Sequence, residues 1–178
     1  AVSTGADRVV LVDPHEAGVA DFFDVPADVV TACPLLADPL PDGLADPLFL
    51  APDDGAVDLA ESVRDAYGAG AVDHFEKTRH SGSEVTVEPS DATVADRDVV
   101  VVDDIVATGS TMSEAIAVLR ERGVARVYAV CVHAVLADSA RTRLARAGVE
   151  AVYATDTVER AASTVSVAPV VAEALAAR

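Results

Sequence analysis

The sequence predicts an α/β fold in which a doubly wound, mainly parallel sheet carries helices on both faces. Short Val-rich runs alternate along the chain with Ala- and Leu-rich stretches whose apolar residues recur at helical spacing. One run, the four valines at 99–102, is apolar without interruption, as is typical of a parallel strand covered on both faces. Such an alternation of strands and helices indicates a parallel sheet, in which ligands bind beyond the carboxyl ends of the strands.

Each element follows from one of these patterns. The Val-rich or mixed apolar runs predict strands at 8–12, 48–51, 72–76, 99–103, 126–132 and 151–154. The stretches at helical spacing predict helices at 57–67, 111–122, 139–147 and 168–177. Gly68-Ala69-Gly70 follows a helix rather than a strand and lacks the third glycine of a dinucleotide-binding motif, so we expect a turn there.

The segment 34–47 separates two parts of the chain. It contains four prolines and few helix or strand signals, so we expect a linker, with residues 1–33 and residues 48–178 in different domains. The chain opens without a methionine, on residues that read like the end of a helix. We therefore expect a processed product or the later part of a longer protein.

Charge and cysteine content narrow the classes of function. Thirty acidic residues against thirteen basic ones give a net charge of −17, which argues against a general nucleic-acid binder. Acid spread along the chain, with almost no lysine, is typical of halophilic proteins, although any acidic cytosolic protein could share it. No stretch is long and apolar enough to span a membrane. Cys33 and Cys131 form no metal-binding cluster, so we expect buried thiols and a cytoplasmic location.

The most informative stretch, residues 99–111, reads as a buried strand, two acids, a small hydroxyl-rich turn and a helix start. The turn can present backbone N–H groups and hydroxyls to a phosphate at the positive end of the helix. The carboxylates of Asp103 and Asp104 are placed to accept hydrogen bonds from vicinal sugar hydroxyls. A sugar 5-phosphate meets both demands. The alternative is that these residues merely cap the strand and the helix, but capping does not require two adjacent acids.

This stretch resembles the signature of the type I phosphoribosyltransferase fold family, because it combines four hydrophobic residues, two acids and Thr-Gly-Ser-Thr at fixed spacing. One departure is Ala107, which stands where many members of that family carry an acid. The resemblance implies that ribose 5-phosphate is bound by Arg79, Asp103, Asp104, Ala107, Thr108, Gly109, Ser110 and Thr111.

Further motifs resemble one branch of that family, the ribose-phosphate pyrophosphokinases of archaeal type. They are Val12-Asp13-Pro14-His15 with residues 22–26, the loop at 50–56, His74-Phe75-Glu76-Lys77-Thr78-Arg79, and the segments 131–136 and 166–169. The resemblance implies that residues 1–33 are the end of an ATP-side first domain. Residues 48–178 would form the phosphoribosyltransferase-type domain, with the last helix packing back on the first.

The resemblance also implies a metal site and a catalytic pair. His15 and Asp53 would hold Mg²⁺ bound to nucleotide phosphates. Lys77, the single lysine of the sequence, would act with Arg79 to stabilise negative charge on the transferred group. A solvated basic pair at a strand end is the plainer interpretation. His74, His80 and His133 show no clear partners in the sequence, and we assign them no chemistry.

The implied reaction transfers the diphosphoryl group of ATP to the anomeric hydroxyl of ribose 5-phosphate and gives phosphoribosyl pyrophosphate and AMP. Such transfers depend on positioning and charge neutralisation, and the sequence offers no arrangement for covalent catalysis. Members of this family form homo-oligomers, which we expect here. Two alternatives remain: a phosphoribosyltransferase of nucleotide synthesis or salvage, and a non-catalytic regulatory relative that binds ribose 5-phosphate.

Overall fold

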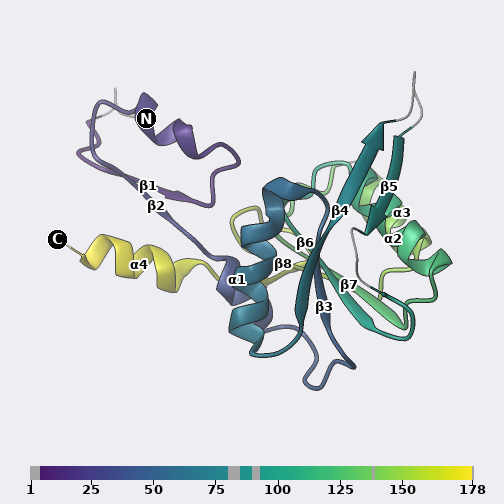
Figure 1. The fold of residues 1–178 in the computed structure, drawn as a ribbon. Helices are drawn as coiled ribbons and strands as arrows, with labels where there is room; N and C mark the ends of the chain where they lie inside the picture. The colour runs from purple at the N-terminus through teal and green to yellow at the C-terminus, as the bar shows by residue number, and fades with distance from the viewer. Residues whose placement is uncertain (1–4, 80–84, 90–92, 138, 178) are drawn as a thin grey trace.

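The computed structural model describes residues 5–79, 85–89, 93–137 and 139–177, and its main body is a seven-stranded sheet flanked by helices (Figure 1). The strand order is β5-β4-β3-β6-β7-β8-β9, and every neighbouring pair is parallel except β4 and β5. The main sheet consists of β3 (Leu48–Ala51), β4 (Ala71–Arg79), β5 (Val85–Pro89), β6 (Asp98–Ile105), β7 (Arg126–His133), β8 (Ala151–Thr155) and β9 (Ser163–Val165). The predicted fold class, a doubly wound and mainly parallel sheet, is confirmed.

The strand order reverses at the centre of this sheet. The chain leaves β3 through α1 (Val57–Tyr67) to β4 on one side, and β6, β7 and β8 follow on the other side. In an open α/β sheet, such a reversal separates the loops that follow the two central strands and leaves a crevice beyond their carboxyl ends. The fold therefore places a ligand crevice above the ends of β3 and β6.

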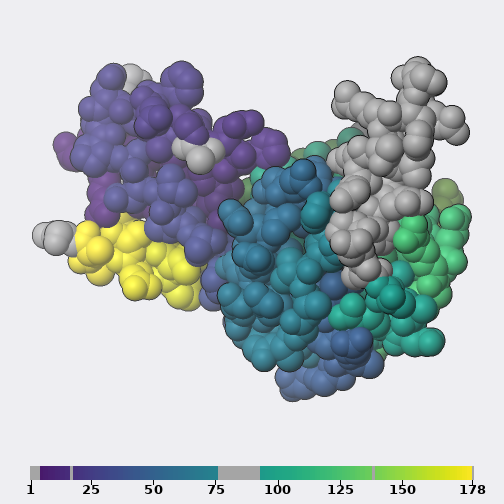
Figure 2. All heavy atoms as spheres, in the orientation of Figure 1, coloured from purple at the N-terminus to yellow at the C-terminus, as the bar shows by residue number. Residues whose placement is uncertain are grey.

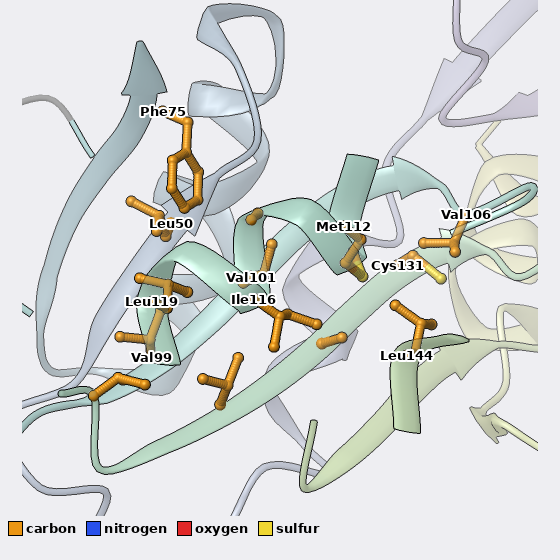
Figure 3. Close-up of a cluster of buried hydrophobic side chains, with 14 of the residues drawn as sticks. Leu50, Phe75, Val99, Val101, Val106, Met112, Ile116, Leu119, Cys131 and Leu144 are labelled. Carbon is orange, nitrogen blue, oxygen red and sulfur yellow. The ribbon is translucent and has the colours of Figure 1, made fainter. Parts of the chain in front are cut away.

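Side chains of the central strands alternate between two apolar cores, one on each face of the sheet. Leu48 and Leu50 face one core, whereas Phe49 and Ala51 face the other, and all four are fully buried. The first core is covered by α2 (Ser110–Glu121) and α3 (Ala140–Ala147), and the second by α1. Figure 3 shows the first core, in which side chains of β6 and α2 meet. Each buried Leu, Ile or Val there stabilises the fold by roughly 1.5–3 kcal/mol.

A smaller unit lies beside the main sheet (Figures 1 and 2). It contains β1 (Val9–Val12), the 3-10 helix η2 (Ala17–Phe22) and β2 (Ala27–Val30), and β1 and β2 pair in parallel. The last helix, α4 (Ala168–Ala176), packs against both strands, and the Arg8 guanidinium donates to the carbonyl oxygen of Ala177. Residues 9–30 together with α4 are called the N-terminal unit below.

The proline-rich segment that joins the two parts is packed rather than extended. It begins in the 3-10 helix η3 (Cys33–Ala37), and Leu36, Leu40 and Leu44 are buried in the second core. The Tyr67 hydroxyl donates to the Pro41 carbonyl at 2.9 Å and accepts from the Leu44 amide at 3.0 Å. These contacts fasten the segment to the end of α1, so in the structure it belongs to the body of the main sheet.

The predicted helices and strands match the structure to within a few residues at their ends. Three strands were not predicted, namely β2, β5 and β9, and neither were the 3-10 helices η2, η3 and η4 (Asp54–Ala56). The expected turn after α1 is confirmed: Gly68 ends the helix with φ +84° and Gly70 has φ +109°. Both cysteines are free and buried, as predicted. Among the described residues, no helix combines the length and apolar character that a membrane crossing requires.

Candidate active site

Five polar residues from the ends of three strands meet at one cavity. Asp53 follows β3, Asp103 and Asp104 end β6, and the N-terminal unit adds Asp13 and His15 from the loop after β1. These residues line a cavity of about 330 Å³, whose remaining walls are Pro14, Glu16, Val29, Gly55, Ala56 and Leu59. The site therefore lies between the N-terminal unit and the switch point of the main sheet.

Asp103 and Asp104 are adjacent acids in a restricted space. The Asp104 amide donates to Asp103 Oδ1 at 2.9 Å, which fixes the first carboxylate against the end of the strand. Burial is the largest cause that raises the pKa of Asp103, and the negative charge of Asp104 adds to it. Ionising both carboxylates is therefore unfavourable in the empty site. Hydrogen-bond donors such as sugar hydroxyls, or a nearby cation, would stabilise the ionised pair.

His15 lies directly over the second acid of the pair. Its Nδ1 is 2.6 Å from Asp104 Oδ2, and the side chain of His15 is 69% exposed whereas that of Asp104 is 16% exposed. The hydrogen bond and the charge of Asp104 raise the pKa of the His15 imidazole. The structure thus brings together His15, from one end of the chain, and the aspartate pair that the sequence singled out.

Asp53, the second predicted metal ligand, lines the same cavity. Its Oδ1 accepts a hydrogen bond from the Gly55 amide at 3.1 Å and caps the 3-10 helix η4. Among the residues that the structure describes, no three acids, histidines or cysteines lie close enough to enclose a metal by themselves. Asp53, His15, Asp103 and Asp104 are among the residues that line the cavity.

The predicted phosphate loop connects β6 to α2. Thr108 Oγ1 and Ser110 Oγ are 3.0 Å apart, and Gly109 precedes the helix in the left-handed region with φ +69°. The loop surrounds a cavity of about 130 Å³, which is lined by Asp103, Ile105, Val106, Ala107, Thr108, Gly109, Ser110, Thr111 and Met112. Asp103 therefore lines both this small cavity and the larger one beside His15.

Lys77 and Arg79 lie on β4, whose backbone is extended as expected. Lys77 pairs with Val87 and Arg79 with Val85 across the antiparallel β4–β5 ladder. The side chains of both residues, and the whole of His80, lie outside the described part of the chain. Their predicted catalytic role therefore remains a prediction.

Two histidines that were assigned no partners in the sequence have partners in the structure. His74 Nε2 is 2.9 Å from Asp54 Oδ1. His133 ends β7 and lies between Thr157 Oγ1 and the carbonyl oxygen of Asp13, each at 2.9 Å. Neither pair is local in sequence, so no spacing signal could have shown it. Asp13 was also missed as a cavity residue, although it stands in a motif that the sequence had marked.

The fold and the site together point to one protein family. The family profile described as the phosphoribosyl transferase domain matches residues 38–167, which is most of the chain. The chain therefore belongs to the phosphoribosyl transferase domain family.

Individual relatives carry more specific names than the family profile does. Over 175 residues, the chain is 65% identical to a ribose-phosphate pyrophosphokinase of Halobacterium salinarum, covering 98% of this chain and 62% of the relative. It is 45% identical over 177 residues to that of Methanopyrus kandleri, covering 98% and 60%. A crystal structure of phosphoribosylpyrophosphate synthetase from Mycobacterium smegmatis superposes with a TM-score of 0.80 at 32% identity, covering 99% of this chain and 60% of that one. The chain thus spans about three fifths of the length of these relatives.

Proposed function

We propose that this chain carries the ribose 5-phosphate site of a ribose-phosphate diphosphokinase. The reaction transfers the diphosphoryl group of ATP to the C1 hydroxyl oxygen of ribose 5-phosphate and releases AMP. The observation that carries the proposal is the pair of cavities that share Asp103: one is enclosed by a phosphate loop, and the other is lined by His15 and Asp53. A sugar bound across Asp103 extends its phosphate into the first and its anomeric hydroxyl towards the second.

The small cavity suits a phosphate monoester. Its wall is the turn before α2, where backbone N–H groups at the helix start have no partner within the helix and attract an anion. The hydroxyls of Thr108, Ser110 and Thr111 add donors at the same place. Ala107 supplies only its backbone to this loop. Its carbonyl accepts from the Ala137 amide at 2.9 Å and holds the turn.

Asp103 and Asp104 are proposed to hold the ribose hydroxyls. Each carboxylate accepts hydrogen bonds, and vicinal hydroxyls supply two donors at a matching spacing. Holding the sugar here orients the C1 hydroxyl for attack. In a reaction that depends on positioning more than on covalent chemistry, this accounts for much of the acceleration.

The residues around the larger cavity fit a hydrated Mg²⁺ ion. Mg²⁺ prefers oxygen donors, keeps several waters, and is usually held by one or two carboxylates together with substrate phosphates. Asp53, Asp103 and Asp104 supply such oxygens to the cavity, and their mutual repulsion favours a cation among them. We propose that Asp53 and His15 hold the ion, which would neutralise charge on the ATP phosphates. His15 would then leave its contact with Asp104.

Lys77 and Arg79 are proposed to stabilise the charge that develops on the transferred group. The support is their place in a motif shared with the pyrophosphokinase branch and the extended backbone of β4, which runs to Arg79 at the same edge as the acids. Lysine provides a compact charge and arginine a planar fork, so the two are not interchangeable at such a site.

The Asp13-Pro14-His15 loop distinguishes the proposal from the main alternative. A phosphoribosyltransferase that consumes phosphoribosyl pyrophosphate needs the phosphate loop but has no need of a histidine delivered from the N-terminal unit to Asp104. Three of the relatives described above carry pyrophosphokinase or synthetase names, which supports the same choice. We also propose a homo-oligomer, which light scattering after size exclusion in concentrated salt would test.

A ³¹P NMR titration tests the proposal. The chain is placed in molar KCl with Mg²⁺, ribose 5-phosphate is added first and ATP second. The proposal expects a shifted sugar-phosphate signal, then AMP and a new diphosphate signal on the sugar. A shifted signal without AMP would restrict the chain to the ribose 5-phosphate half-site. A folded sample with neither effect would refute the site.

Two substitutions, one at the proposed sugar site and one as a control, test the role of Asp104. Asp104→Asn should weaken ribose 5-phosphate binding by roughly tenfold or more, because a hydrogen bond to a charged group contributes about 1.5–3 kcal/mol. Asp24→Asn changes an exposed acid of the N-terminal unit and should bind as the unchanged chain does. Equal binding by all three proteins would remove Asp104 from the sugar site.

A further inference from the structure

His133 connects the main sheet to the loop that carries His15. It ends β7, which lies next to β6 in the sheet, and its Nε2 is 2.9 Å from the carbonyl oxygen of Asp13. A carbonyl oxygen can only accept, so Nε2 carries the proton and donates. The bond spans two parts of the chain that are 120 residues apart in sequence.

The other ring nitrogen is held from the opposite side. Thr157 Oγ1 lies 2.9 Å from His133 Nδ1 and also 3.1 Å from Thr155 Oγ1. The Val132 carbonyl accepts from the Thr155 hydroxyl at 2.8 Å and from the Thr157 hydroxyl at 3.0 Å, so the two threonines, this carbonyl and His133 form one network. The imidazole is thus held at both ring nitrogens, which restricts its orientation.

Asp13 is fixed by its own side chain as well. Asp13 Oδ2 accepts from the Ala32 amide at 2.6 Å, and Oδ1 is 3.6 Å from the Cys33 sulfur. The residue has φ +38°, in a region that few residues other than glycine adopt, so its surroundings must hold it there. Two residues later the chain reaches His15, whose Nδ1 contacts Asp104.

We propose that His133 is a positioning residue for the site. Its hydrogen bond to the Asp13 carbonyl sets the orientation of the N-terminal unit on the main sheet and so places His15 over the end of β6. In the proposed arrangement His133 contacts neither the substrate nor the metal. The consequence for the metal rests on the proposed function, whereas the consequence for the orientation of the unit does not.

Distance measurements between two spin labels test the orientation directly. Labels at Asp21→Cys on η2 and Glu121→Cys at the end of α2 report the separation of the two bodies, since both positions are exposed. Cys33 and Cys131 are buried, and single-label samples check that they stay unmodified. The unchanged background should give one narrow distance distribution.

Three substitutions of His133 and its neighbours separate hydrogen bonding from packing. His133→Phe keeps a ring but loses both hydrogen bonds and should broaden or shift the distribution. His133→Gln keeps a donor that can reach the Asp13 carbonyl and should restore a narrow one. Thr157→Val should lie between them, and His74→Phe, a histidine on β4, should change nothing. A distribution for His133→Phe equal to the background refutes the proposal, as does equal broadening by His133→Gln.

Ligand binding supplies the second measurement. Mn²⁺, used alone as a probe of the His15 and Asp53 site and detected by electron paramagnetic resonance, should bind about tenfold more weakly to His133→Phe. Ribose 5-phosphate should bind within about twofold of the unchanged chain, because its loop belongs to the main sheet. Equal loss of both ligands would contradict a positioning role. If the unchanged chain binds neither, the proposed function fails while the label distances still decide the role of His133.

Discussion

Replacing Asp103 by asparagine should stabilise the ligand-free protein while weakening the sugar site. The folded state raises the pKa of Asp103 from an ordinary 3.8 to about 7, through burial first and then the charge of Asp104. At about 1.36 kcal/mol per pH unit, this sets an upper limit of about 4 kcal/mol on the penalty for ionising the group. Asparagine carries no charge and can still accept the hydrogen bond from the Asp104 amide. Since the two acids share their repulsion, we expect a gain on the order of 2 kcal/mol.

The sign of the pH dependence follows from the raised pKa. Between 3.8 and about 7 the folded state binds more protons at this site than the unfolded state, so the stability of the unchanged chain falls as pH rises through that window. The advantage of Asp103→Asn should therefore reach only about 40% of its full size at pH 5 and be complete at pH 8. For a chain of this size, a gain of about 2 kcal/mol corresponds to a rise in Tm of roughly 4–8 °C.

Thermal unfolding at the two pH values, in molar KCl without divalent ions, measures this directly. Asp24→Asn provides the control for the loss of one acid from an already negative chain. A gain of the same size at both pH values would mean that general charge reduction is responsible. No gain at pH 8 would refute the view that the aspartate pair is strained before ligands bind.

Three other substitutions test the fold that supports the site. Asp98→Asn should cost about 2–4 kcal/mol in urea unfolding, because Asp98 is buried and holds Arg126 and the Ala45 amide. Arg126 lowers the pKa of Asp98 below its ordinary 3.8, so its contribution is fully present above pH 3.8 and is lost as pH falls from there through the lowered pKa of the folded state. Gly70→Ala should destabilise far more than Gly68→Ala. An added Cβ would meet the Pro47 carbonyl oxygen at 2.6 Å at the first position and nothing within 4 Å at the second. Leu119→Ala should cost about 2–5 kcal/mol, since its side chain is fully buried in the first core. Equal losses at the two glycines, or a Leu119 variant with unchanged stability, would contradict the packing described.

The sequence predicted the parts of this molecule that local chemistry determines. Four consecutive valines followed by two acids and a hydroxyl-rich turn predicted a buried strand, its end and a helix start, and the structure places β6 and α2 there. β2 and β9 were missed because four and three residues carry too little periodicity, and β2 contains an aspartate. β5 exists through its pairing with β4, which sequence spacing does not reveal.

Contacts between distant segments account for what could not be predicted at the site. The motif at 12–15 indicated that His15 mattered, but its contact with Asp104 joins residues 89 positions apart. His133 stands in the marked segment 131–136, but its role could not be predicted, because its partners are a backbone carbonyl and a threonine hydroxyl on other elements. Partners of this kind cannot be recognised from the residue types in the sequence.

The return of α4 to β1 and β2 has a consequence for the order of folding. The main sheet is built from neighbouring strand–helix–strand segments, so its contacts can form while synthesis proceeds. The N-terminal unit cannot be finished in this way, because its strands at 9–12 and 27–30 must wait for a helix at 168–176. β1 and β2 are therefore synthesised before the main sheet but are covered only after it. Until then their apolar side chains and strand edges are exposed to pairing with other chains.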